Sequence, residues 1–116
     1  MMTESRDNLA IQMHAAVETL IMAPSIDAYN RVSKMLATLT SAGVKSESLD
    51  EAAEAVNAVC DRYERVKLVG VSATEAEVLR MRAGELDRLL ASIPVNVFKA
   101  AKSVVNANFE AMQGAA

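Results

Sequence analysis

Two side chains that could take part in metal or covalent chemistry occur once each in the sequence, His14 and Cys60. A protein metal site needs several converging ligands, and one imidazole and one thiol on separate predicted helices supply too few. The Glu-x-x-His elements of di-metal helical bundles are also missing, because residue 11, three positions before His14, is not glutamate. The sequence therefore predicts neither a metal site nor a cofactor.

A lone histidine on a predicted helix invites comparison with histidine phosphotransfer domains, which carry the motif His-x-x-Lys-Gly. In this sequence Val17 takes the position of the lysine, and Glu18 takes that of the glycine. The carboxylate of Glu18 would repel a phosphoryl group on His14. We therefore interpret His14 as an ordinary, partly exposed histidine.

Cys60 lies beside an apolar stripe, four residues after Val56 and three before Tyr63. The acidic neighbours Asp61 and Glu64 would destabilise a thiolate at this position, which disfavours a nucleophilic role. We expect a small core residue. The sequence also lacks a Ser-His-Asp pattern on loops and a glycine-rich phosphate loop, so we predict that the protein is not an enzyme.

Basic residues recur on the last two predicted helices. They would form either a surface for RNA, a nucleotide or an acidic partner, or a solvated face paired with acids such as Glu85 and Asp87. Apolar residues off the main stripes would form a strip for self-association or complete a wider core; these are Ile11, Ala15, Val78 and Met81. The candidate interaction surface comprises Arg80, Arg82, Arg88, Lys99, Lys102, Met81 and Val78, with Arg31 and Lys34 as extensions.

The element that organises these residues is a predicted amphipathic helix in the stretch from Ser48 to Gly70. Ser48 and Glu51 have the spacing of a capping box, and Gly70 can adopt the left-handed conformation that ends a helix. Acidic residues gather at the start of the stretch and basic residues at its end, which suits the helix dipole. Its predicted buried stripe is Ala52, Val56, Val59, Tyr63 and Val66.

Four further helices follow from periodicity, caps and prolines. Ser25 should cap the second and Gly43 end it, while either Ser72 with Glu75 or Thr74 with Glu77 should start the fourth. Gly84 inside the fourth helix would mark a close helix contact. The predicted ranges are 3–23 before Pro24, 26–42, about 74–93 before Pro94, and about 95–112. Their predicted buried stripes are, in the same order, Leu9, Met13, Ala16, Val17, Leu20 and Ile21; Ile26, Tyr29, Val32, Leu36 and Leu39; Leu79, Ala83, Leu86, Leu90 and Ile93; and Phe98, Ala101, Val105, Phe109 and Met112.

Length and composition place these helices in one all-α domain, residues 1–116, a compact bundle of four to five short antiparallel helices. Of the 116 residues 52% are hydrophobic and 23% charged, which favours a folded chain. The net charge of −3 makes nucleic acid a disfavoured partner without excluding it. The sequence lacks a secretory leader pattern and an apolar run of the roughly 20 residues that span a membrane, so we expect a cytoplasmic protein.

Three stretches resemble small uncharacterised helical proteins encoded on phages, plasmids and integrated elements of proteobacteria. They are the run from His14 to Leu20, the link from Gly70 to Glu75, and the segment from Pro94 to Val105. The resemblance implies an accessory protein that blocks host defence or transcription by binding.

We therefore predict a non-enzymatic protein-interaction module that occludes a protein partner, such as an anti-CRISPR-like inhibitor of host defence, and that forms homo-oligomers through its spare apolar strip. One alternative is a ligand-binding or sponge protein that holds an anionic nucleotide near Arg80 and Arg82. Another is an RNA-binding subunit, whose binding would depend strongly on salt.

Overall fold

The computed structural model describes residues 13–115, and the side chains of residues 13–111. Residues 13–22 are helical, and the remaining helices are α2 (Ile26–Ser41), α3 (Glu47–Val66), α4 (Ala73–Ser92) and α5 (Val95–Ala115). The described part of the chain contains no strand, so the predicted all-α bundle is confirmed. The start of the first predicted helix, with Leu9 and Ile11, lies outside the described residues, as does the side chain of Met112.

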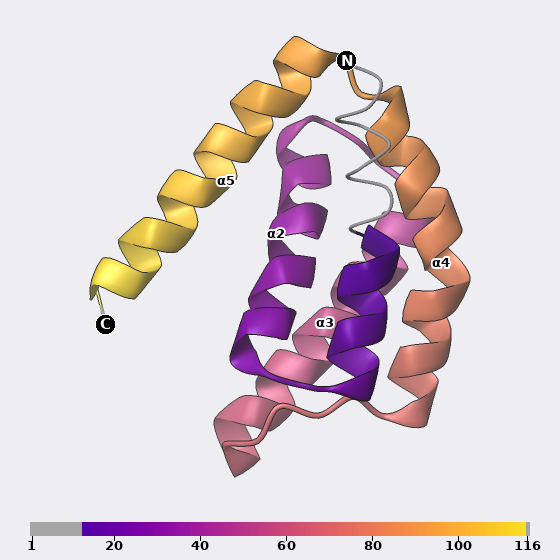
Figure 1. Cartoon of the computed structure of the whole chain (residues 1–116), viewed down its shortest axis with the longest axis vertical. Helices are drawn as coiled ribbons and strands as arrows, with labels where there is room; N and C mark the ends of the chain where they lie inside the picture. The colour runs from indigo at the N-terminus through magenta and orange to yellow at the C-terminus, as the bar shows by residue number, and fades with distance from the viewer. Residues whose placement is uncertain (1–12, 116) are drawn as a thin grey trace.

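Successive helices run in opposite directions, as their short connections predict (Figure 1). Residues 13–22 lie between α2 and α4, and α3 crosses behind them (Figure 1). The main packed pairs are α3 with α4, α2 with α5, and α2 with α3. Helix α5 begins beside the end of α4 and diverges from the bundle toward its C-terminus, so it covers only one side of α2 (Figure 1).

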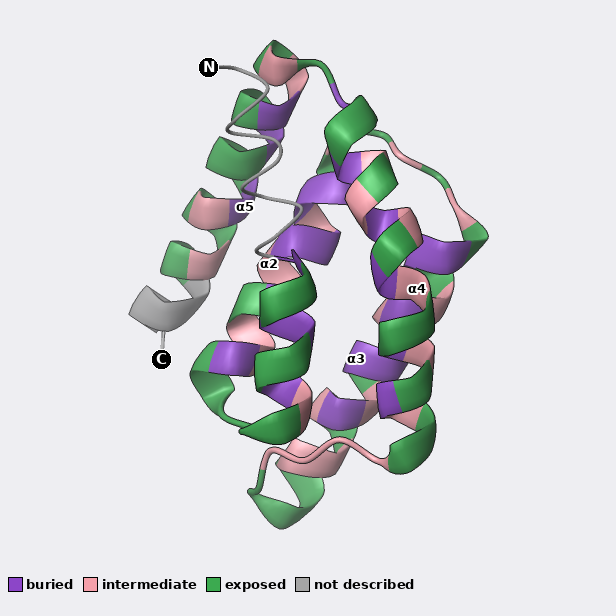
Figure 2. Ribbon diagram, turned by 45° about the vertical axis from the view of Figure 1, so that its right-hand side comes forward, coloured by how far each residue is buried: buried purple, intermediate pink, exposed green. Residues whose placement is uncertain are grey.

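The core is formed by the inward faces of the helices, where the buried residues face one another (Figure 2). Every helix contributes small or medium apolar side chains, and most of the predicted stripes are confirmed. The buried members include Met13, Val17 and Leu20; Val32, Leu36 and Leu39; Ala52, Val56 and Val59; Leu79, Ala83, Leu86, Leu90 and Ile93; and Phe98, Ala101 and Val105.

Three predicted helix signals are confirmed. The Ser25 side chain accepts a hydrogen bond from the Ala28 amide at 3.0 Å and caps α2. Gly43 follows α2 with φ +86°, a conformation that favours glycine. Of the two possible starts for α4, the chain uses Ser72 with Glu75, which form a reciprocal capping box.

The predicted ends of α3 are wrong. The helix begins at Glu47 because Ser46, two residues earlier than predicted, accepts a hydrogen bond from the Ser48 amide at 3.1 Å; Ser48 itself is buried inside the helix. At the other end Lys67, not Gly70, takes the left-handed conformation, with φ 61°. Its amide donates to the Tyr63 carbonyl at 2.7 Å, which helps offset the cost of about 1–2 kcal/mol for a non-glycine residue there.

Two more expectations are corrected. Gly84 marks no close helix contact, since a Cβ added there would meet nothing within 4 Å. The predicted stripes also extend past the core: Ile26 and Val66 are 51% and 53% exposed, and Tyr63 is half-buried. The last turns of α3 project beyond the neighbouring helices (Figure 1), so the inward face of α3 continues where the bundle has already ended.

We predict that Leu79→Ala lowers the free energy of unfolding by about 2–5 kcal/mol, because Leu79 is fully buried in α4 and its truncation leaves a cavity. Urea denaturation followed by circular dichroism measures the change. Val104→Ala is the matched control: Val104 is 52% exposed on α5, so its truncation should change stability by no more than about 0.5 kcal/mol. Equal effects of the two variants would contradict the burial of Leu79 in the core.

Candidate functional site

The arginines of α4 do not gather on one face. Arg80 pairs with Glu18 of the first helical segment, with Nε 3.0 Å from the carboxylate, whereas Arg82 pairs with Glu51 of α3 at 2.6 Å. These partners lie on different neighbours of α4, so the two arginines point to different sides of it. Arg88 pairs with Glu85 of its own helix at 2.5 Å, as the solvated-face interpretation predicts. All three guanidinium groups therefore serve ion pairs within the bundle.

The remaining basic candidates lie elsewhere. Lys102 of α5 lines a groove between α2 and α5 together with Arg31 and Lys34, the two residues predicted to extend the basic surface. Lys99, one turn earlier on α5, is exposed and does not line this groove. The structure thus brings together the basic residues of α2 and α5 and separates them from the arginines of α4.

The off-stripe apolar residues have mixed positions. Val78 is half-buried and packs against the core, which fits a wider core stripe. Met81 is 62% exposed and Ala15 is also exposed, so neither belongs to the core. Ile11, the remaining member of the predicted strip, lies outside the described residues.

His14 is exposed and contacts Asp87 of α4 through Nε2. Burial raises the pKa of Asp87, while the neighbouring imidazole opposes that rise. Val17, which takes the position of the lysine in the His-x-x-Lys-Gly motif, is buried, and Glu18 pairs with Arg80. The lysine that serves the phosphoryl group in that motif is therefore replaced by an apolar side chain. The contact joins the first helical segment to α4.

Cys60 is half-buried rather than a core residue, and it lines a second groove at the end of the bundle. We call this the end groove. It lies between the first turns of α2 and the last turns of α3, has a volume of about 230 Å³, and is mostly apolar. Its lining residues are Ile26, Tyr29, Asn30, Val59, Cys60, Tyr63, Glu64 and Val69.

The end groove contains both tyrosines of the chain. Burial raises the pKa of Tyr29, and Cys60 and Asp61 add to that rise. Two large apolar residues lie between the lining residues Glu64 and Val69 in the sequence: Val66, which is 53% exposed, and Leu68, which is 72% exposed. Large apolar side chains that remain in water next to tyrosines are typical of a protein-binding surface.

The chain segment 67–72 that carries Leu68 and Val69 is fixed by Arg62 of α3. Its guanidinium donates to the Gly70 carbonyl at 2.9 Å and to both carboxylate oxygens of Glu75 at 3.0 and 2.6 Å. Glu75 also accepts a hydrogen bond from the Ser72 amide at 2.9 Å. Arg62 lowers the pKa of Glu75, and the hydrogen bonds from Ser72 add to this effect against partial burial. We call this network the Arg62 clip.

Sequence reasoning missed the end groove because it assigned Ile26, Tyr63 and Val66 to the core. A usable signal was present in the link after α3, where Leu68, Val69 and Val71 form an apolar run that a solvated connection does not need. The Arg62 clip could not be predicted from the sequence, because Arg62 and Glu75 are 13 residues apart and lie on different helices.

Within residues 13–111, no three or more His, Cys, Asp or Glu side chains lie close enough to hold a metal ion. In the same part of the chain, no helix combines the length and apolar character needed to cross a membrane.

Comparison with protein-family models, with curated proteins and with solved structures finds no match. The resemblance to proteins of mobile elements therefore stays a prediction.

We predict that Glu75→Gln lowers the free energy of unfolding at pH 7 and makes the free energy of unfolding change less between pH 7 and pH 3. The folded-state pKa of Glu75 lies below its ordinary value of 4.5, so its contribution is complete above about pH 4.5 and is lost as pH falls through the lower, folded value. Urea denaturation at pH 7 and pH 3 measures both effects. Glu77→Gln, at an exposed position of the same helix, is the control and should retain the wild-type acid dependence.

Proposed function

We propose that the protein is a non-enzymatic protein-interaction module and that the end groove is its binding surface. The observation that carries the proposal is the coincidence of an apolar groove, both tyrosines and the exposed side chains of Val66 and Leu68 at one end of the bundle. Aromatic and aliphatic anchors of this kind supply most of the binding free energy in protein interfaces.

The shape of the groove indicates what it would accept. A volume of about 230 Å³ between two helices suits one or two large apolar side chains projecting from a partner. Glu64 lines the groove, and its exposed neighbours in the sequence, Asp61, Arg65 and Lys67, add further charges of both signs to the end of α3. Such charges select a partner by charge complementarity while the apolar centre supplies affinity.

The Arg62 clip supports the same function. Because segment 67–72 is tied to α3 and α4, Leu68 and Val69 are held near one position before a partner arrives. A preorganised surface loses less conformational entropy on binding than a mobile loop does. Occlusion of a host defence protein is the specific form of this function that the resemblance suggests, and it rests on the resemblance alone.

We predict that Leu68→Asp abolishes capture of the partner. A charge in the apolar contact should weaken binding by at least about tenfold, or 1.4 kcal/mol. Because Leu68 is 72% exposed, the substitution should change the free energy of unfolding by no more than about 0.5 kcal/mol. The measurement is affinity capture from host lysate, with bound proteins quantified by mass spectrometry.

Val104→Asp and Met81→Asp are matched controls, since both replace exposed apolar residues away from the end groove, and both should retain the partner. Light scattering of the purified protein over a range of concentrations tests whether the partner is a second copy of the chain. A partner lost equally from all three variants, or retained by Leu68→Asp, would contradict the end groove as the binding surface.

A further inference from the structure

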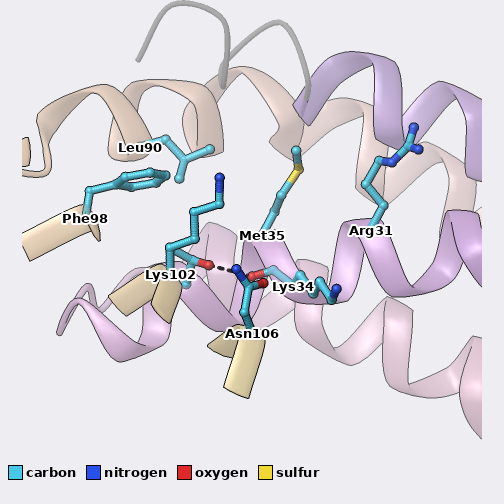
Figure 3. A pocket seen from close by; sticks show the side chains of 8 residues that line it. Arg31, Lys34, Met35, Leu90, Phe98, Lys102 and Asn106 are labelled. Atoms are coloured by element: carbon cyan, nitrogen blue, oxygen red, sulfur yellow. Dashed lines mark hydrogen bonds between the residues drawn. The ribbon is translucent and has the colours of Figure 1, made fainter. Parts of the chain in front are cut away.

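The groove between α2 and α5, which Lys102 lines, has a different chemistry from the end groove. Its floor is apolar and buried, formed by Met35 of α2, Leu90 at the end of α4 and Phe98 of α5. Its rim carries three cations, Arg31 and Lys34 from α2 and Lys102 from α5, whose charged ends point in different directions in Figure 3. No carboxylate is among the residues that line it. We call it the cationic groove.

The three cations of the cationic groove are not used by the bundle's ion pairs. Among the side chains of residues 13–111, the carboxylates in ion pairs are bound to His14, Arg62, Arg80, Arg82 and Arg88. Lys34 instead lies over the ring of Phe109, with Nζ 5.4 Å from the ring centroid. An anion that enters the groove therefore meets cations that no carboxylate among the groove-lining residues neutralises.

The floor adds a requirement for an apolar group on the same ligand. In Figure 3 the Lys102 side chain extends between Phe98 and Leu90 on one side and Met35 on the other. The groove has a volume of about 130 Å³. A cavity of about 150 Å³ accommodates one benzene ring, so the available space suits a single planar ring. Asn106 adds an amide that can donate to or accept from a polar substituent.

We propose that the cationic groove binds a small phosphomonoester that carries one planar ring, with the ring on Phe98 and Leu90 and the phosphate between Lys102 of α5 and the cations Arg31 and Lys34 of α2. A phosphomonoester carries about 1.5 to 2 negative charges at pH 7, which matches three cations better than the single charge of a carboxylate. The guanidinium of arginine can donate hydrogen bonds to two phosphate oxygens at once, and the ammonium group of lysine adds a compact positive charge. This site is independent of the end groove, since the two share no lining residue.

The test is a titration of the isotope-labelled full chain with phenyl phosphate, followed by amide chemical shifts in NMR. We expect shifts at positions 34–38 of α2 and 98–106 of α5. Inorganic phosphate, phenol and benzoate each lack one feature of the ligand, and each should bind at least about fivefold more weakly, a difference of roughly 1 kcal/mol. Adenosine monophosphate distinguishes a nucleotide from a simple aryl phosphate: tighter binding than phenyl phosphate identifies a nucleotide, and weaker binding identifies an aryl phosphate.

Two lysines of α5 give a matched pair of variants. Lys102→Gln should weaken phenyl phosphate binding at least about fivefold, whereas Lys99→Gln removes the same charge from the same helix outside the groove and should weaken it less than twofold. Both positions are exposed, so both variants should fold. Equal effects of the two variants, shifts confined to other helices, or equal affinity for phosphate and phenyl phosphate would overturn the proposal. Binding of an RNA oligonucleotide at these positions without binding of phenyl phosphate would also overturn it.

Discussion

The exposed end of the bundle depends on one side chain, Arg62, which connects three parts of the chain. It extends from α3, binds the Gly70 carbonyl in the link, and meets the carboxylate of Glu75 in the first turn of α4. Glu75 also belongs to the capping box with Ser72, so the start of α4 and the path of the link are determined together. Val69 and Val71 of the link pack against the core, and the Arg62 clip adds the polar contacts that fix the backbone of the link beside the end groove.

Charge is distributed so that most arginines serve the architecture. Arg80 and Arg82 join α4 to two different neighbours, and Arg88 stays within its own helix. Such exposed pairs contribute little stability individually, although those of Arg80 and Arg82 connect α4 to its neighbours. Arg31 and Lys34 of α2 and Lys102 of α5 have no such role, and they line the groove beside α2 from which α5 diverges. The end groove lies where the last turns of α3 extend past the core, whereas the cationic groove lies over core residues of α2, α4 and α5.

The sequence predicts the interior of this fold better than its surface. Buried positions such as Val32, Val59 and Leu86 follow from helical periodicity, and the Ser25 cap and Gly43 end follow from local backbone chemistry. Periodicity does not reveal where the core ends, so Ile26 and Val66 were assigned to an interior that they do not reach. Nor does it show which residues of different helices meet, and the pairing of Arg62 with Glu75 and the grouping of Lys102 with Arg31 both depend on tertiary packing.

The central claim is that the end groove receives the partner, and the single cysteine of the chain reports on it directly. Cys60 lines the groove and is half-buried, so its alkylation by iodoacetamide can be followed without any substitution. The decisive measurement compares the alkylation rate of Cys60 in the free protein and in the purified complex with its partner. Our account predicts at least about a tenfold slower reaction in the complex, because partner side chains fill the groove above the thiol. An unchanged rate in a fully formed complex would contradict it.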